Sequence, residues 1–326
     1  MKMNATEKST PLVSILIPCY NSEGTVAEAI DSALAQTYPT VEVIVVDDGS
    51  NDDSTEILAS YGDRIRWKSI PNSGACTARN EALKMAKGTL IQFLDADDLL
   101  MPEKIARQVP LLLNGDLDLV FCRGTIFGDG RPERPRKSPT ESPEGKDPFV
   151  YCLHHRLSTL GPLHRRDLLD QVGGFRPGVP FAQELDLHLR LCAAGAKIEF
   201  QEDLLYSMRH LPSEARISQN ARPAGALLRI LLELTDELMR RPHYKMTRQR
   251  CRALASVIAQ HGIYAYRNGA QSIPARAFHF ARKLDPDFSV EERPWYRTAA
   301  RGIGYMNMER FLAAARGVRD RVYLSN

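Results

Sequence analysis

The feature that most constrains this fold is an alternation of short apolar runs with amphipathic helical patterns along the first 122 residues. The run at residues 12–18, LVSILIP, is rich in branched side chains and ends on a proline, which predicts a buried parallel strand. Similar runs follow at residues 41–46, 65–70, 89–94 and 117–122. Repeated strand–helix units of this length predict an α/β fold with a mostly parallel sheet and helices on both faces.

Polar side chains cluster where three of the expected strands end. Residues 19–21 (Cys-Tyr-Asn) follow the first strand, Asp47 and Asp48 end the second, and residues 95–98 (Asp-Ala-Asp-Asp) follow the fourth. In parallel α/β sheets, ligands bind beyond the carboxyl ends of the strands. We therefore expect these side chains to meet at one edge of the sheet and to form a ligand site.

The character of the chain changes towards its C-terminus. Residues 128–148 are dense in proline, glycine and charge and predict a mobile loop, which is either an active-site lid or a plain surface insertion. Residues 220–326 show helical patterns only and carry 19 Lys and Arg against 9 Asp and Glu, a net charge of +10, whereas residues 1–219 carry 24 and 31, a net charge of −7. We expect a disordered lead-in at residues 1–11, an α/β domain at 12–219 and a basic helical region at 220–326.

Composition narrows the environment of the protein. No stretch approaches the ~20 apolar residues of a membrane-spanning helix, and the polar N-terminus does not resemble a secretory signal. The six cysteines lack Cys-x-x-Cys spacing, which favours reduced thiols in a cytoplasmic protein. The basic region could contact the inner face of an anionic membrane or an acidic polysaccharide, or it could be a solvated helical domain. It has no nucleic-acid-binding motif, so no nucleic acid partner is expected.

The acids after the fourth strand predict a metal site. Asp95 and Asp97 alternate at the end of a strand, so both carboxylates can point the same way. Two close carboxylates repel each other unless a cation neutralises them. Mn²⁺ and Mg²⁺ prefer oxygen ligands and complete their shells with water and phosphate, which suggests a nucleoside diphosphate. The alternative is a loop in which Asp97 or Asp98 only caps the next helix. Asp48 has no obvious structural role, because Gly49 already supplies the flexible turn position.

Five segments carry a resemblance to a known family. In order they are VSILIPCYNSEGTVAEAIDSALAQTYPTVEVIVVDDGSNDDSTEIL, NSGACTARNEALKMAKG, LIQFLDADDLLMPEKI, VGGF and QELDLHLRL, spread over residues 12–210. Together they resemble the family 2 glycosyltransferases of the GT-A fold. The resemblance implies an inverting transfer of a sugar from a nucleotide sugar, UDP by analogy, to a hydroxyl of a glycan or lipid-linked glycan, as in polysaccharide or cell-envelope biosynthesis. It does not extend into residues 220–326.

The resemblance also implies roles in binding the donor. Pro18 and Tyr20 match positions that contact the nucleotide base, and Asp48 matches the acid that binds the base or ribose. Arg79 matches an arginine near the diphosphate, a role that suits a guanidinium group. From the residues alone, Tyr20 could be simple core packing, and Arg79 could be a charge on a helix surface.

Three residues match the metal site of the family. Asp95 corresponds to the ribose-side acid and Asp97 to the metal ligand, and we expect both to hold Mn²⁺ or Mg²⁺. His210 lies near a histidine that joins the metal shell in many relatives, although here Arg209 is adjacent rather than two residues before it. A structural role for His210 is the alternative.

The expected catalytic base lies at the start of a helix with the sequence QELDLHLR, residues 183–190. The resemblance places Glu184 where the family usually has an aspartate, and Leu185 and His188 where it usually has aromatic residues. The extra methylene of glutamate displaces the carboxylate, and about 1 Å can matter for catalysis. Asp186 is the competing base, but it could instead pair with Arg190 at i, i+4.

Two other readings of the chain follow from these departures. The glutamate at the base position is compatible with a catalytically degenerate protein that only binds sugar nucleotides. A dinucleotide-binding oxidoreductase would need a Gly-x-Gly-x-x-Gly turn after the first strand. Residues 18–24, PCYNSEG, lack that turn.

Overall fold

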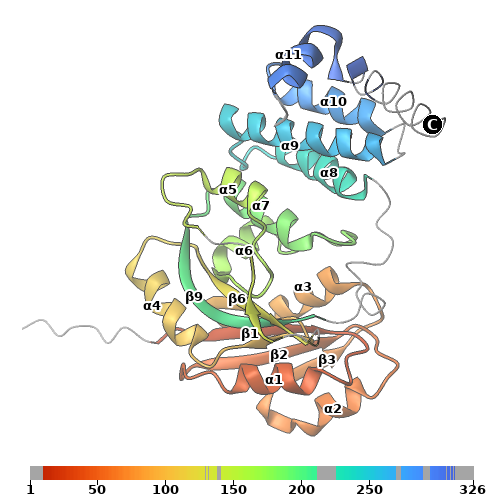
Figure 1. Ribbon diagram of the computed structural model, residues 1–326. Helices are drawn as coiled ribbons and strands as arrows, with labels where there is room; N and C mark the ends of the chain where they lie inside the picture. Colours follow the sequence, from red (N-terminus) through yellow and green to blue (C-terminus); the bar gives the residue numbers. More distant parts are fainter. Residues whose placement is uncertain are drawn as a thin grey trace, which may run out of the picture. The chain divides into compact units, whose positions relative to one another are not determined.

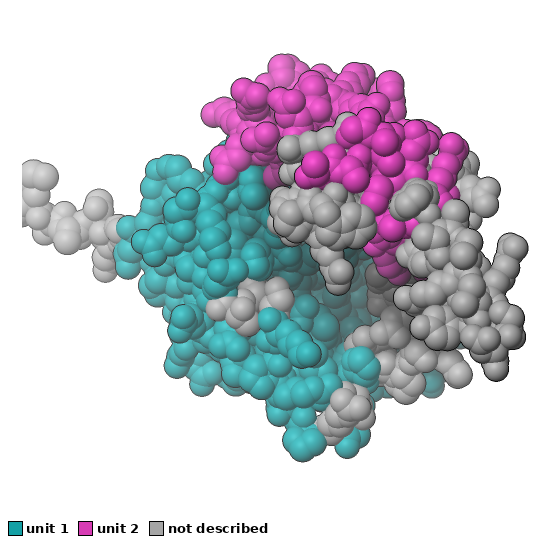
Figure 2. Space-filling view, turned by 45° about the horizontal axis from the view of Figure 1, so that its top comes forward, with its two compact units in different colours: residues 1–217 teal, residues 218–326 magenta. Residues whose placement is uncertain are grey.

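The structure is a computed structural model that describes residues 10–128, 130, 132–137, 141–210, 225–268, 273–288, 294–305, 307–308, 310 and 312. The chain divides into two compact units, residues 1–217 and 218–326, which Figure 2 draws in teal and magenta. The boundary expected at residue 219 and most of the expected lead-in lie outside the described residues. In the described part of the chain, no helix combines the length and apolar character needed to cross a membrane.

The first half of unit 1 alternates strands and helices, as the sequence pattern predicts. The elements are β1 (Val13–Cys19), α1 (Val26–Leu34), β2 (Val41–Asp47), α2 (Ser54–Ser60), β3 (Arg66–Ser69), α3 (Ala75–Met85) and β4 (Leu90–Phe93). β1 pairs with β2 and β4, and β2 pairs with β3, all in parallel. Cys19 lies opposite Asp47 in this register, so the loops after β1 and β2 leave the sheet side by side.

The second half of unit 1 is mixed rather than parallel. Its elements are β5 (Leu99–Leu100), α4 (Lys104–Asn114), β6 (Leu119–Phe127), β7 (Arg134–Pro135), α5 (Pro148–His154), β8 (Leu163–Arg165), α6 (Arg166–Val172), α7 (Gln183–Ala194) and β9 (Ile198–Arg209). The sheet order is β3-β2-β1-β4-β8-β6-β9-β5, with β7 paired to β6. β8 runs antiparallel to β4 and β6, and β9 runs parallel to β6 and antiparallel to β5.

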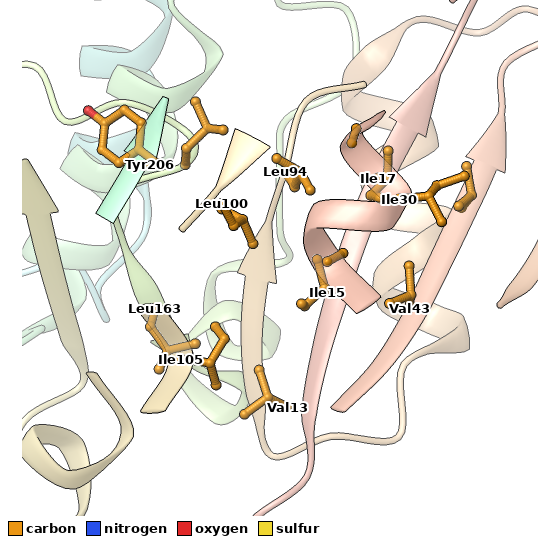
Figure 3. Close-up of a cluster of buried hydrophobic side chains, with 14 of the residues drawn as sticks. Val13, Ile15, Ile17, Ile30, Val43, Leu94, Leu100, Ile105, Leu163 and Tyr206 are labelled. Atoms are coloured by element: carbon orange, nitrogen blue, oxygen red, sulfur yellow. The ribbon is translucent and has the colours of Figure 1, made fainter. Parts of the chain in front are cut away.

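Branched side chains of the central strands form the core of unit 1. Val13, Ile15 and Ile17 on β1 lie on one face of the sheet, where they pack with Ile30 of α1 and Val43 of β2 (Figure 3). The same cluster continues through residues of the second half, namely Leu94, Leu100, Ile105, Leu163 and Tyr206. Figure 1 shows α1 and α2 on one side of the strands and α3 on the other. Since each branched side chain stabilises the fold by ~1.5–3 kcal/mol when fully buried, this core fixes the strand ends where the acids lie.

Unit 2 is helical throughout its described part, as expected. It contains α8 (Ala226–Arg240), α9 (Arg248–Arg267), α10 (Ile273–Leu284) and α11 (Pro294–Ile303). Leucines at helical spacing on α8 are buried, namely Leu228, Leu231, Leu234 and Leu238. α9 and α10 pack along each other, and the Phe278 ring of α10 stacks on the Tyr305 ring at 5.4 Å.

Candidate active site

Hydrogen bonds join the loops that follow β1 and β2. The Asn21 N–H donates to Ser50 Oγ, and the Asn51 N–H donates to Asn21 Oδ1, each at 2.9 Å. Asn21 has a left-handed backbone with φ 47°, a conformation that persists only where the surroundings fix it and that clusters at functional sites. The joined loops fix the end of β1, where Pro18 is half-buried and the Tyr20 side chain is 42% exposed. This exposure makes Tyr20 available to a flat ligand and removes the core-packing alternative.

Asp48 has a structural role that the sequence did not reveal. Its buried carboxylate accepts hydrogen bonds from the backbone N–H groups of Ser73 and Gly74, each at 2.8 Å. Those residues immediately precede α3, so Asp48 ties the end of β2 to the positive end of the α3 dipole. Our expectation that Asp48 lacks a structural role is therefore wrong. The sequence could not reveal this role, because the hydrogen-bond partners of Asp48 lie 25 and 26 residues away along the chain.

Arg79 connects three elements at the edge of the sheet. It lies on α3, and its Nη2 is 2.6 Å from Asp95 Oδ1, beyond β4. Its Nη1 donates to Gln183 Oε1 at the start of α7, at 2.7 Å, and the guanidinium carbon lies 5.0 Å from the Phe175 ring centroid. Burial alone would lower the pKa of Arg79, but Asp95, Cys76 and Glu184 together raise it, and the net shift is upward. Arg79 is therefore a fixed, buried cation and not a helix-surface charge.

Glu184 lies in the electrostatic neighbourhood of this pair. It is the second residue of α7, and α7 begins after Ala182, whose φ of 52° is left-handed. Burial raises the pKa of Glu184, Arg156 and Arg79 oppose that rise, and Asp95 adds to it. Through the bonds of Arg79 to Asp95 and Gln183, the fold brings the loop after β4 next to the start of α7, which carries Glu184.

Asp186 occupies a different environment on the same helix. Its side chain is fully buried, with one oxygen 2.8 Å from Arg176 Nη2 and the other 2.9 Å from Arg190 Nη2. The i, i+4 pair that the sequence allowed is therefore present. Arg190 also donates to the backbone oxygens of Val172 and Gly174. Because two guanidinium groups enclose this fully buried carboxylate, it is not accessible to a ligand.

Arg209, the last residue of β9, fixes the acidic loop at residues 95–98. Its N–H donates to Asp98 Oδ1 at 2.7 Å, its Nε donates to Asp97 O at 3.0 Å, and its Nη2 lies 2.6 Å from Glu28 Oε2. Burial raises the pKa of Asp98 well above its usual range, and the charges of Asp97 and Asp95 raise it further. Three carboxylates therefore share one short loop, and their mutual repulsion is of the kind that a cation relieves.

The expected metal ligands fit an ion that binds together with a nucleotide. Among the described residues, no group of three or more His, Cys, Asp or Glu could hold a metal by itself. Asp95 gives one oxygen to Arg79, while Asp97 is half-exposed. His210 is half-buried next to Arg209, and its backbone N–H donates to the backbone oxygen of Phe127 at 2.7 Å. Mg²⁺ commonly uses only one or two protein carboxylates when substrate phosphates and waters complete its shell.

Two arginines near the site were missed by the sequence analysis. In the loop expected to be mobile, residues 132–137 are docked on the sheet, where the Glu133 carboxylate accepts from the hydroxyls of Ser207 and Thr125. This docking places Arg136 Nη1 2.6 Å from Tyr206 Oη and within electrostatic reach of Asp98. Arg156, in the loop after α5, is exposed and reaches Glu184 electrostatically. Nothing in the local sequence distinguishes these arginines from solvated charges.

The strand order, the acidic loop after β4 and the arginine beside it define an α/β domain of the GT-A type. The sequence model described as "Glycosyl transferase family 2" matches residues 14–173. Through this domain the chain belongs to glycosyl transferase family 2.

Curated relatives are similar to 57–70% of this chain. An uncharacterized glycosyltransferase of Rickettsia felis is 35% identical over 242 residues, which are 70% of this chain and 40% of that protein. One of Rickettsia typhi is 34% identical over 209 residues, 61% of this chain and 64% of that protein. The chondroitin synthase of Pasteurella multocida is 32% identical over 198 residues, 57% of this chain and 19% of that protein. The matches span less than two thirds of each relative.

A solved structure shows the same fold. The crystal structure of S. aureus TarS 1-349 in complex with UDP-GlcNAc has a TM-score of 0.71 and 21% identity, and it covers 94% of this chain and 92% of that chain. At this identity the likeness concerns the fold. It includes helices beyond the GT-A domain, where the family model does not reach.

Proposed function

We propose that this protein transfers a sugar from a nucleotide sugar to an acceptor hydroxyl and inverts the anomeric carbon. One observation carries the proposal: Arg79 on α3 donates both to Asp95 of the acidic loop and to Gln183, the neighbour of Glu184 at the start of α7. Family membership supports the reaction class. The UDP-GlcNAc complex of the TarS neighbour makes a UDP-sugar the first donor to test.

The donor nucleotide would bind at the ends of β1 and β2. Pro18 and the exposed ring of Tyr20 would contact the base. Asp48 would bind the base or the ribose, because each carboxylate oxygen keeps a second lone pair after accepting one backbone N–H. Asp95 would face the ribose, and Arg79 would lie beside the diphosphate.

Glu184 would take the proton from the acceptor hydroxyl. The raised pKa of Glu184 makes its carboxylate a stronger base than an exposed glutamate and brings it closer to the working pH. A single displacement by that hydroxyl, opposite the leaving diphosphate, inverts the anomeric carbon. The fixed guanidinium of Arg79 is suited to stabilise the charge that develops on the diphosphate.

Asp97, with Asp95 and His210, would hold Mn²⁺ or Mg²⁺ together with the diphosphate. When bound, such an ion supplies positive charge that stabilises the leaving group. The contribution of the chain is to hold the loop still, and Arg209 does so through its bonds to Asp97 and Asp98. Arg209 thus acts as a positioning residue for the Asp97 carboxylate.

The acceptor proposed here is a glycan or lipid-linked glycan of the cell envelope. The chondroitin synthase among the relatives supports a polysaccharide product. A cytoplasmic location at the inner face of a membrane is part of the proposal. All six cysteines are free, and Cys152 Sγ and Cys192 Sγ lie 3.7 Å apart without a disulfide bond, which suits a reducing compartment.

Two substitutions test the proposed chemistry, using sugar transfer detected by mass spectrometry with a panel of nucleotide sugars and UDP binding followed by calorimetry. We expect Glu184→Gln to keep UDP affinity and to lose ~10²–10⁴-fold in turnover. Asp97→Ala should abolish transfer and the Mn²⁺ dependence of UDP binding. The exposed Glu202→Gln on β9 is the matched control and should behave like the wild type.

The outcomes separate the alternatives. Unchanged turnover in Glu184→Gln would move the base elsewhere. Near-normal turnover in Asp97→Ala would remove the metal role. UDP binding by the wild type without transfer or hydrolysis of any donor would instead indicate a degenerate sugar-nucleotide-binding protein.

A further inference from the structure

Unit 2 holds the excess positive charge of the chain. Residues 218–326 contain 19 Lys and Arg but only 9 Asp and Glu. The active-site residues proposed above all lie in unit 1, so the proposed chemistry does not use these cations. Their arrangement within unit 2 therefore needs a separate explanation.

Many of these cations gather at one end of three helices. α8 ends at Arg240, and the chain turns there so that α9 begins at Arg248. α10 ends at Leu284, and the next residue, Asp285, lies 3.1 Å from Arg252 near the start of α9. The end of α8, the start of α9 and the end of α10 thus form one surface. We call it the cationic end, and its exposed members are Arg240, Arg241, Lys245, Arg248, Arg252, Arg282 and Lys283.

The acids of unit 2 neutralise only part of this surface. Arg240 pairs with Asp236, Arg241 with Glu237 and Arg252 with Asp285, at 3.1–3.3 Å. Within the described part of unit 2, the other four members of the cationic end have no ion-pair partner, namely Lys245, Arg248, Arg282 and Lys283. Met239, in the last turn of α8, is 56% exposed among them.

We propose that the cationic end docks on an anionic phospholipid surface. Lys and Arg near such a surface each contribute about 1 kcal/mol, which is about five-fold in affinity. Their aliphatic stems can lie along an apolar boundary while the charges stay hydrated. An exposed methionine gains contact area at a bilayer interface, whereas a hydrated polyanion offers it little. Met239 is therefore the observation that favours lipid over an acidic polymer.

Vesicle cosedimentation of the full chain tests the proposal. We expect binding to phosphatidylcholine vesicles only when phosphatidylglycerol is included, and we expect the binding to weaken as salt screens the charges. Absence of binding to the anionic vesicles at low salt would overturn the proposal.

Two pairs of charge reversals test whether vesicle binding depends on the cationic end or on net charge alone. Arg248→Glu with Lys283→Glu changes the cationic end. Arg229→Glu with Arg276→Glu makes the same change in net charge near the starts of α8 and α10, where both side chains are also exposed. Since each cation is worth about five-fold, the first pair should weaken binding by about 25-fold or more. The second pair should change it by less than about three-fold, because charges beyond the Debye length are screened. Equal losses of vesicle binding in the two double variants would overturn the proposal that the cationic end is the docking surface.

A third variant separates lipid from polymer. Met239→Ser should weaken vesicle binding and leave binding to heparin, used as a soluble polyanion probe, unchanged. If heparin binds tightly and Met239→Ser leaves vesicle binding unchanged, the cationic end would be assigned to an acidic polymer and the lipid proposal would be overturned. UDP affinity, measured without vesicles, should be the same in every variant, so failure of this proposal and failure of the proposed transferase function remain distinguishable.

Discussion

The β2–α3 corner and the α6–α7 corner of unit 1 each contain a buried aspartate whose hydrogen bonds and ion pairs come from different kinds of partner. Asp48 accepts two hydrogen bonds from the neutral backbone N–H groups of Ser73 and Gly74. Asp186 lies between the charged guanidinium groups of Arg176 and Arg190. Both side chains are buried, so exposure alone does not distinguish them.

The partners decide what each carboxylate can still do. Neutral donors fix the position of Asp48 without cancelling its charge, which remains available to a ligand. Two guanidinium groups cancel the charge of Asp186 and enclose it, so its role is to hold α7 in place. Asp95 is intermediate, because it shares one oxygen with Arg79 while its side chain stays 28% exposed. At these two corners, the acid with neutral partners is the one proposed to bind ligand, and the acid with cationic partners is structural.

The largest effect is expected for Asp186→Ala. Removing this carboxylate takes away the ion-pair partner of the buried Arg190, a type of change that costs about 3–5 kcal/mol in the free energy of unfolding. Urea denaturation followed by circular dichroism measures it. The control is Asp170→Ala, which removes the exposed i, i+4 pair with Arg166 and should cost less than about 1 kcal/mol. If Asp186→Ala lowered the unfolding free energy as little as Asp170→Ala does, the structural role given to Asp186 would be contradicted.

The fold could be predicted from sequence where contacts follow the order of the chain. β1 to β4 are adjacent parallel strands separated by helices, so each short apolar run marks its own element. The second half depends on pairings between distant segments, such as β5 with β9 and β4 with β8. Two-residue and three-residue strands of this kind leave no periodic pattern, and their pairing partners cannot be found from one sequence.

Lys104 extends the comparison to a buried cation. Its Nζ donates to Gln92 Oε1 and Gln108 Oε1 at 2.5 Å and to Gly161 O at 3.2 Å, all neutral acceptors. Burial lowers the pKa of Lys104 from 10.5 to about 8. Between these pH values the unfolded chain binds more protons than the native one, so the stability of the native protein rises with pH.

The second prediction compares Lys104→Met with the wild type at pH 7.5 and pH 9.5. Relative to Lys104→Met, the wild type should gain about 2 kcal/mol in unfolding free energy between pH 7.5 and pH 9.5. The gain follows from the lower pKa of Lys104 in the native protein than in the unfolded chain. Equilibrium denaturation at both pH values measures it. Lys84→Met, at an exposed position of α3, is the control and should show no such shift. A pH-independent difference would show that the Lys104 charge is compensated.

The candidate site could be predicted only in part. The positions of the acids at strand ends indicated a common edge, and Arg79 does meet Asp95 there. What the sequence could not show is the partner of each charge. His188 illustrates this limit: it occurs in a helix that carries the proposed base, but burial lowers its pKa to about 3, and its ring stacks on His164 at 5.7 Å. His188 is therefore part of the core, although it lies only four residues after Glu184 in the sequence.

The smallest effect on stability, and the sharpest test of the comparison, is expected for Asp48→Ala. Loss of two bonds to the N–H groups before α3 should cost about 1–2 kcal/mol in unfolding free energy, as for the loss of a helix cap. The loss in UDP binding free energy, measured by calorimetry, should exceed the loss in unfolding free energy, because the uncompensated charge of Asp48 is proposed to face the nucleotide. Asp63→Ala, at an exposed position after α2, is the control and should change neither quantity. If Asp48→Ala lost stability alone and kept UDP affinity, Asp48 would belong with Asp186 as a structural acid, and the rule that neutral partners mark a ligand-binding carboxylate would not hold in this domain.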